Sequence, residues 1–230
     1  MTLTDGGRGP VGPGALEYSI VRAPDPGLIR QAVRLHRSSL DRGFLTSLGE
    51  PFLQALYEEL LRHELAFLVV AREGDPLRGF ILASTDSTRM LSVVLRSPHR
   101  FVWSVLAAIV RRPQTVARLV ETLSYGPKTA GVPAELIAIA VQPGLRSLGI
   151  GARLLAALDA EVFSRGVRAY KVTVHRDMTD ADRFYRRNGF HLATTFRLYG
   201  LGWNLYVREL GAVPREGGSA GAGDPGKDPR

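Results

Sequence analysis

The stretch from 134 to 159, "AELIAIAVQPGLRSLGIGARLLAALD", constrains the fold more than any other part of the chain. It begins with nine almost wholly apolar residues, a pattern typical of a central strand buried on both faces. Pro143 and Gly144 interrupt this run. Beyond Gly149 and Gly151 the apolar residues recur at helical spacing. A strand that passes through a glycine-containing loop directly into a helix predicts an α/β domain.

Hydrophobic periodicity in the rest of the chain predicts further strands and helices around this unit. Helices are expected at 27–41, 47–64 and 179–189, and strands at 17–23 and 167–175. The segment 65–84 and the closing segment 190–210 each have the pattern of a hairpin. This order of elements predicts one α/β (α+β) domain with a mixed sheet flanked by helices.

Three segments depart from this pattern. Residues 1–15 and 211–230 are rich in Gly and Pro and nearly lack large apolar side chains, so we expect disordered tails around a domain at 16–210. Between the strands, 89–130 is predicted to be a helical insertion with apolar residues every three or four positions. A membrane-surface helix is the alternative for the insertion. It is disfavoured because the arginines do not fall on one face.

Composition excludes several classes of protein. The absence of cysteine excludes a disulfide scaffold, a cysteine-ligated zinc site and a thiol nucleophile. Without a signal-peptide pattern or a long apolar stretch, a cytoplasmic protein with no membrane segment is expected. The net charge of +8, much of it within 89–128, attracts anions but does not choose among nucleotides, nucleic acids and acidic lipids.

The glycine loop has two interpretations. Unpaired amides at the start of a helix, together with the helix dipole, favour an anion, and Gly149 and Gly151 would let a phosphate approach the main chain. Arg146 can add a cationic contact. Alternatively, the glycines only allow the helix to pack close to the sheet. Neither G-x-G-x-x-G nor the Lys-Ser/Thr of a P-loop is present, so a phosphate-binding loop of another kind is predicted.

Two motifs resemble those of the GNAT acetyltransferase superfamily. "RSLGIGA" (146–152) resembles the motif Arg/Gln-x-x-Gly-x-Gly/Ala, and "DADRFYRRNGF" (180–190) resembles Ala-x-x-x-Tyr-x-x-x-Gly-Phe. The resemblance implies a mixed, mostly antiparallel central sheet flanked by helices, the GNAT fold. It is close over 134–198, looser over 17–88 and absent over 89–130. Met178 stands where the family usually has Asn, and Thr173 where the branch that acetylates protein N-termini has Glu, which weakens assignment to that branch.

The resemblance implies acetyl-CoA as co-substrate and no metal. The pantetheine arm is expected to pair with the backbone of Ile139, Ala140 and Val141, with the Ile139 amide stabilising the developing oxyanion. The pyrophosphate is expected to contact the main chain of a loop and helix start formed by Arg146, Leu148, Gly149, Ile150, Gly151 and Ala152.

The family's usual general acid corresponds to Tyr185, and a phenol is protonated at neutral pH. The alternative is a core aromatic residue. Glu135 is the first candidate for the general base, because it resembles the glutamate of the histone-acetyltransferase branch. Its expected apolar surroundings, on a strand face shared with 137, 139 and 141, would raise its pKa. The alternatives are an exposed glutamate at a strand end, a base made of water, or His36, His175 or Asp177.

The chain is therefore expected to be an N-acetyltransferase, monomer or homodimer, for a primary amine of a small molecule, such as an amino sugar, or of a peptide. Leu45, Thr46 and Leu48 are expected to line the acceptor site, and the basic insertion either recruits an acidic acceptor or is a solvated arginine face. Two other functions remain: a CoA-binding module without catalysis, and a nucleic-acid-binding protein. The second is disfavoured because no basic strand interleaved with aromatic residues is present.

Overall fold

The computed structural model describes residues 16–40, 44–90, 96–111, 131–198 and 200–211 of the 230-residue chain. The predicted tails lie outside these ranges, except for Gly211. So does much of the predicted insertion. The described strands are β1 Glu17–Val21, β2 Phe67–Arg72, β3 Leu77–Ser84, β4 Glu135–Val141, β5 Ala169–His175, β6 His191–Leu198 and β7 Leu201–Glu209. The described α-helices are α1 Pro26–Ser39, α2 Phe44–Ser47, α3 Glu50–Arg62, α5 Pro98–Arg111, α7 Ile150–Ser164 and α8 Thr179–Arg187.

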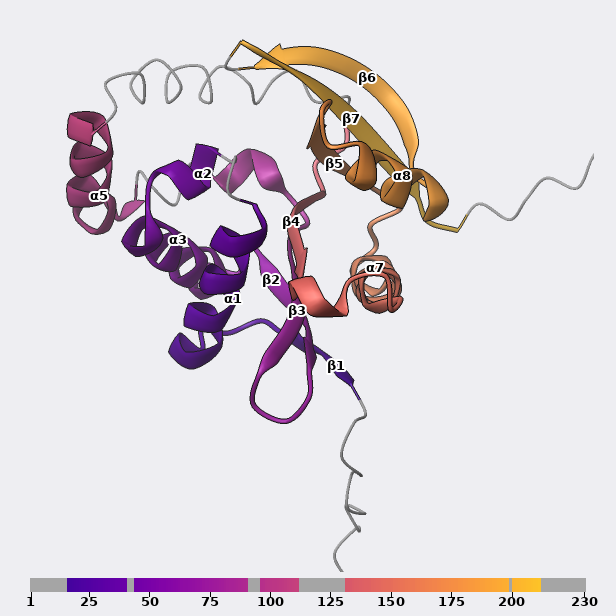
Figure 1. The fold of residues 1–230 in the computed structure, drawn as a ribbon, viewed down its shortest axis with the longest axis horizontal. Helices are drawn as coiled ribbons and strands as arrows, with labels where there is room; N and C mark the ends of the chain where they lie inside the picture. Colours follow the sequence, from indigo (N-terminus) through magenta and orange to yellow (C-terminus); the bar gives the residue numbers. More distant parts are fainter. Residues whose placement is uncertain (1–15, 41–43, 91–95, 112–130, 199, 212–230) are drawn as a thin grey trace, which may run out of the picture.

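The strands form one seven-stranded sheet in the order β1-β2-β3-β4-β5-β7-β6 (Figure 1). Neighbouring strands are antiparallel except for β4 and β5, which are parallel. The prediction of a mixed, mostly antiparallel sheet is confirmed. Because β4 and β5 run in the same direction, their connection must cross over the sheet, and α7 makes that crossover.

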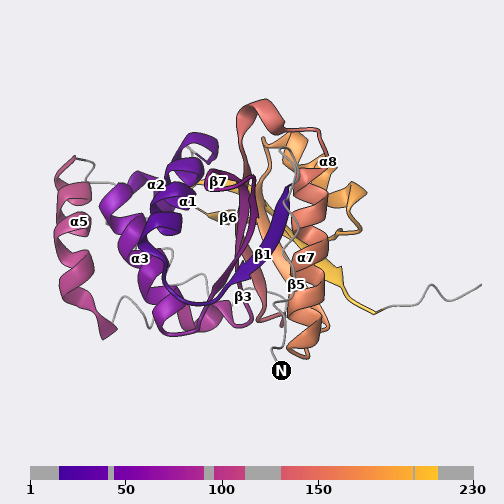
Figure 2. The same cartoon turned by 90° about the horizontal axis from the view of Figure 1, so that it is seen from below.

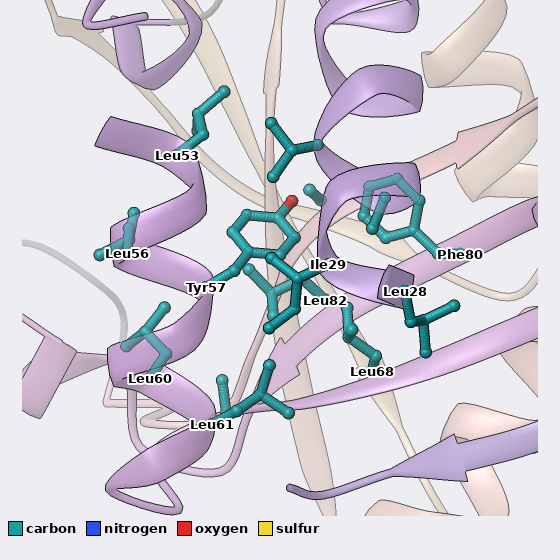
Figure 3. Packing of buried hydrophobic residues seen from close by; sticks show 14 of the residues in the cluster. Leu28, Ile29, Leu53, Leu56, Tyr57, Leu60, Leu61, Leu68, Phe80 and Leu82 are labelled. Carbon is teal, nitrogen blue, oxygen red and sulfur yellow. The ribbon is translucent and has the colours of Figure 1, made fainter. Parts of the chain in front are cut away.

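Helices α1 and α3 cover one face of the sheet. Asp25 caps α1, since its carboxylate accepts a hydrogen bond from the Leu28 amide at 3.0 Å, and Pro26 occupies the first turn. The apolar residues of both helices then meet strands β2 and β3 in a core built around the buried Tyr57 and Phe80 (Figure 3). Each large side chain buried in this way contributes roughly 1.5–3 kcal/mol.

Helix α5 lies outside α3 and makes up most of the part of the predicted insertion that the structure describes (Figure 2). Phe101 of α5 contacts Phe52 of α3 edge to face, at 5.4 Å between ring centroids. Arg100 forms an ion pair with the buried Glu59 of α3 at 2.6 Å. This arginine of the insertion therefore holds α5 on α3 rather than presenting a free charge to a ligand.

The other face of the sheet carries α7 and α8 (Figure 2). Helix α7 places its buried leucines against the apolar side chains of β2 and β3, in a second core cluster. Helix α8 adds Tyr185 to the same cluster, beside the buried Tyr206 of β7. Both segments that carry the sequence motifs therefore lie on one side of the sheet.

Candidate functional site

The loop between β4 and α7 makes a tight turn. A short 3₁₀ helix spans Pro143–Leu145, and Ser147 and Gly149 follow with positive φ angles of 67° and 78°. A left-handed conformation costs a residue with a side chain roughly 1–2 kcal/mol, and such strain gathers at functional sites. Ser147 was not among the predicted site residues, and a serine carries no sequence signal for this conformation.

The two glycines of the motif have different roles. A Cβ atom built on Gly149 would meet no atom within 4 Å, so the space beside this residue is open. A Cβ atom on Gly151 would come within 3.1 Å of the Phe184 ring of α8. The interpretation that glycine permits close packing therefore applies to Gly151. The element that packs close to Gly151 is helix α8 and not the sheet that had been expected. Gly149 fits the other interpretation, in which a ligand approaches bare main chain.

The start of α7 presents main-chain donors without partners inside the helix. Gly149 is the N-cap and supplies no side-chain hydrogen bond, so the first amides of the helix, those of Ile150, Gly151 and Ala152, have no intrahelical acceptor. The side chain of Ile150 is buried in the core, and only its main chain is available. Leu148 has 67% of its surface exposed, and Arg146, also exposed, donates from Nε to the Val141 carbonyl at 3.4 Å. These residues form a site suited to an anion.

Strands β4 and β5 diverge next to this loop. Their register contains a single pair, Glu135 with Lys171, beyond which no pairing continues. Gln142 donates its amide to the Arg78 carbonyl on β3. Because successive amides of a strand point to alternate edges, those of Ile139 and Val141 point away from β3, toward the gap. The gap thus has unpaired main-chain donors on its β4 side.

Tyr185 lies on α8 at 4% exposure, and the rings of Phe184, Phe190 and Tyr206 surround it at centroid distances of 5.3, 5.1 and 6.3 Å. Burial raises the pKa of the Tyr185 phenol above its usual value near 10. Among the described residues, its hydroxyl has no hydrogen-bond partner. The side chain is thus both a core aromatic residue, which was the alternative interpretation, and a protonated phenol with a free hydroxyl.

The sequence pattern of a family described as "Acetyltransferase (GNAT) family" matches residues 33–190, more than half of the chain. The chain belongs to this family. As a GNAT acetyltransferase it is an enzyme that depends on acetyl-CoA, as its two motifs predicted. The search of curated proteins found no match.

Solved structures share the fold of the chain at low sequence identity. A protein from Desulfovibrio desulfuricans, described as an acetyltransferase of the GNAT family, is 21% identical with a TM-score of 0.53, over 85% of this chain and 99% of the other. Ard1 from Thermoplasma volcanium is 17% identical with a TM-score of 0.52, over 84% and 97%. The PaiA N-acetyltransferase from Thermoplasma acidophilum, solved with coenzyme A, is 14% identical with a TM-score of 0.50, over 85% and 99%.

The structure corrects the expected orientation of Glu135. On β3, Leu82 and Ala83 pair with Ala138 and Leu136, so Ile137 is an extra residue, a β-bulge in β4. The bulge reverses the alternation of side chains. Ile137 packs toward α1 and α3, whereas Ile139 and Val141 pack toward α7. The prediction that 135, 137, 139 and 141 share a face was therefore wrong. β4 is still a central strand that packs on both faces, with Leu136 in one core cluster and Ala138 and Ala140 in the other, although 135, 137, 139 and 141 are only partly buried.

Glu135 lies on the α1 and α3 side of the sheet, next to Lys171. The Glu135 carboxylate is 3.7 Å from Lys171 Nζ, which also donates to the Val132 carbonyl at 2.6 Å. Burial raises the pKa of Glu135, as predicted, against the opposing effects of a Ser87 hydrogen bond and the Lys171 charge. Lys171 was missed in the sequence, although a lysine within the strand pattern of 167–175 was a signal for a buried partner.

The remaining predicted residues fall into two groups. His36 is buried between α1 and α3, where Nδ1 lies 2.8 Å from the Tyr57 hydroxyl, and burial lowers its pKa to about 4. Leu45, Thr46 and Leu48 supply no free polar group. Leu48 is buried in the core, Leu45 packs against it, and the Thr46 hydroxyl donates to the Leu40 carbonyl. His175 and Asp177, by contrast, lie at the end of β5 and beyond it, beside the gap.

Within the described residues, no helix is long and apolar enough to cross a membrane. The same part of the chain contains no cluster of three or more His, Cys, Asp or Glu residues that could hold a metal ion.

Proposed function

We propose that the enzyme transfers the acetyl group of acetyl-CoA to a primary amine of a small molecule or peptide. The observation that carries this proposal is the open main chain at Gly149, beside the gap between β4 and β5. An anion-binding helix start next to an unpaired strand edge fits a ligand with a diphosphate at one end and an extended amide-containing arm at the other.

The residues present fit that ligand. The amides of Gly149, Ile150, Gly151 and Ala152, with the main chain of Leu148 and the Arg146 guanidinium, would hold the pyrophosphate. The edge of β4 at Ile139, Ala140 and Val141 would pair with the pantetheine arm. When bound, acetyl-CoA supplies an acetyl thioester. That coenzyme A accompanies the similar PaiA structure agrees with this assignment.

The chain's own groups would then supply three functions. The Ile139 amide stabilises negative charge on the carbonyl oxygen during attack by the amine. Tyr185 donates a proton to the departing sulfur as the C–N bond forms and the C–S bond breaks, and its raised pKa keeps it protonated until then. A base takes the proton that the amine loses. Glu135, at the closed end of the gap with a raised pKa, is the proposed base.

Calorimetry of the full chain with acetyl-CoA, followed by thiol release with a panel of amines, tests the proposal. We expect saturable binding and release of coenzyme A that depends on an amine. Binding without thiol release from any amine would instead support a CoA-binding module without catalysis.

A further inference from the structure

Two buried polar atoms on β5 lack partners. Neither Thr173 Oγ1 nor His175 Nε2 has a hydrogen bond to any described residue. An unsatisfied buried donor or acceptor costs roughly 1–3 kcal/mol, so native structures contain few of them, and each such atom needs an explanation. These two lie two residues apart on one strand, which makes a shared explanation attractive.

Both side chains lie on the face of the sheet opposite α7 and α8. Tyr170, Val172 and Val174 of β5 belong to the core cluster under those helices, so the alternate residues point to the other side. Thr173 and His175 also lie beyond the single β4–β5 pair at Lys171. Because β4 and β5 are parallel and pair at Glu135 and Lys171, Thr173 and His175 lie across the gap from the part of β4 that contains Ile139. The proposed diphosphate site is on the α7 side, so a second substrate would reach the gap from this opposite face.

The His175 ring is held in one orientation. The Asp177 amide donates to its Nδ1 at 3.3 Å, and the Trp203 ring packs edge to face at 5.3 Å. Trp203 is itself anchored, since its Nε1 donates to the Leu198 carbonyl at 3.1 Å. The Asp177 carboxylate lies 3.7 Å from the same Nδ1, which is beyond hydrogen-bond distance. Because Nδ1 accepts the hydrogen bond of the Asp177 amide, the neutral ring carries its proton on Nε2. The unpartnered atom of His175 is therefore a donor.

We propose that Thr173 and His175 bind a carbonyl or carboxylate group next to the acceptor's amine, which makes the acceptor an amino acid, an amino-acid amide or a peptide N-terminus. This inference rests on the acetyltransferase function proposed above. The two side chains leave β5 about 6.6 Å apart, at about 3.3 Å per residue, a spacing that hydrogen bonds to one such group can bridge. A carbonyl or carboxylate accepts from both the imidazole N–H and the threonine hydroxyl.

The test uses matched amines and the full chain saturated with acetyl-CoA. For phenylalanine, leucine and glycine, thiol release is measured with the amino acid, its amide and the amine that lacks the carbonyl group. In at least one of the three series, we expect kcat/KM for the amino acid or its amide to be at least 10-fold higher than kcat/KM for the matched amine. Thr173→Val and His175→Leu should remove that advantage, so that the ratio of kcat/KM for the carbonyl-containing member to kcat/KM for its matched amine falls toward one. His175→Gln, which keeps a donor near Nε2, should retain part of the advantage.

Two further measurements separate the outcomes. Thr173→Val should unfold at an equal or higher temperature than the wild type, since the hydroxyl it removes has no partner; a lower temperature would indicate a structural role and overturn the inference. Equal losses of kcat/KM for both kinds of amine, or no carbonyl preference in any series, would also overturn it. If calorimetry shows that the wild type does not bind acetyl-CoA, the proposed function itself fails.

Discussion

Gly149 and Gly166 hold the same left-handed conformation at the two ends of helix α7. The φ angle is 78° in both, and a Cβ atom on either would meet nothing within 4 Å. A side chain at either position therefore costs a similar backbone strain, on the order of 1 kcal/mol. The two residues differ in what lies beside them, because only Gly149 precedes the free amides at the start of the helix.

This pair provides the first prediction. Gly149→Val should lower the affinity for acetyl-CoA at least 10-fold in calorimetry, since the new side chain occupies the space that a phosphate needs. Gly166→Val should lose about the same stability in urea denaturation and keep the wild-type affinity. If both variants bind acetyl-CoA equally well, the main chain at Gly149 is not the diphosphate site.

Tyr185→Phe should reduce kcat about 100-fold and leave the affinity for acetyl-CoA unchanged, because a general acid acts in the chemical step. Tyr170→Phe is the matched control in the same core cluster. This variant lacks the 2.7 Å hydrogen bond that the Tyr170 hydroxyl donates to Asp159, so it should lose about 2 kcal/mol of stability and retain kcat.

In the wild type, activity should persist to a higher pH than an ordinary phenol would allow, because burial raises the Tyr185 pKa. A Tyr185→Phe enzyme with the wild-type kcat would leave the residue only its packing role.

Much of the fold and the loop could be predicted because they depend on local signals. The apolar run of β4, the Pro143 and Gly144 break and the helical spacing of α7 are all properties of neighbouring residues, and the structure has these elements in that order. The general suitability of the loop for an anion follows from the same signals. The conformation of Ser147 does not, since nothing in its sequence neighbourhood demands a positive φ.

The orientation of Glu135 depends on residues far away in the chain. The bulge at Ile137 arises from the pairing of β4 with Leu82 and Ala83 of β3, and the alternation of an isolated strand cannot show it. The ion pair with Lys171 requires β4 and β5 to lie side by side. For the same reason the different roles of Gly149 and Gly151 appear only once α8 is placed beside α7.

If Glu135 is the base, its carboxyl must be ionised for activity, so kcat/KM should rise with pH through its pKa. Since burial raises that pKa, this rise should lie above the usual range for glutamate. Glu135→Gln should lower kcat about 100-fold and abolish the rise. Lys171→Met removes the neighbouring positive charge and should move the rise to higher pH. Each variant unpairs a buried charge and should lose about 3 kcal/mol of stability, so folding is checked by circular dichroism. A Glu135→Gln enzyme with the wild-type pH profile would exclude Glu135 as the base.

His36 should make the stability of the fold depend on pH. Its pKa falls from 6.5 to about 4 on folding, so the folded state favours the neutral ring. The resulting stability is fully present above pH 6.5 and is lost as the pH falls toward 4, by about 3 kcal/mol in all. Urea denaturation at pH 7 and pH 4.5 should show this loss in the wild type and a much smaller loss in His36→Gln. The exposed His191, changed to Gln, serves as the control and should keep the wild-type pH dependence. An equal loss in all three proteins would place the acid sensitivity elsewhere than between α1 and α3.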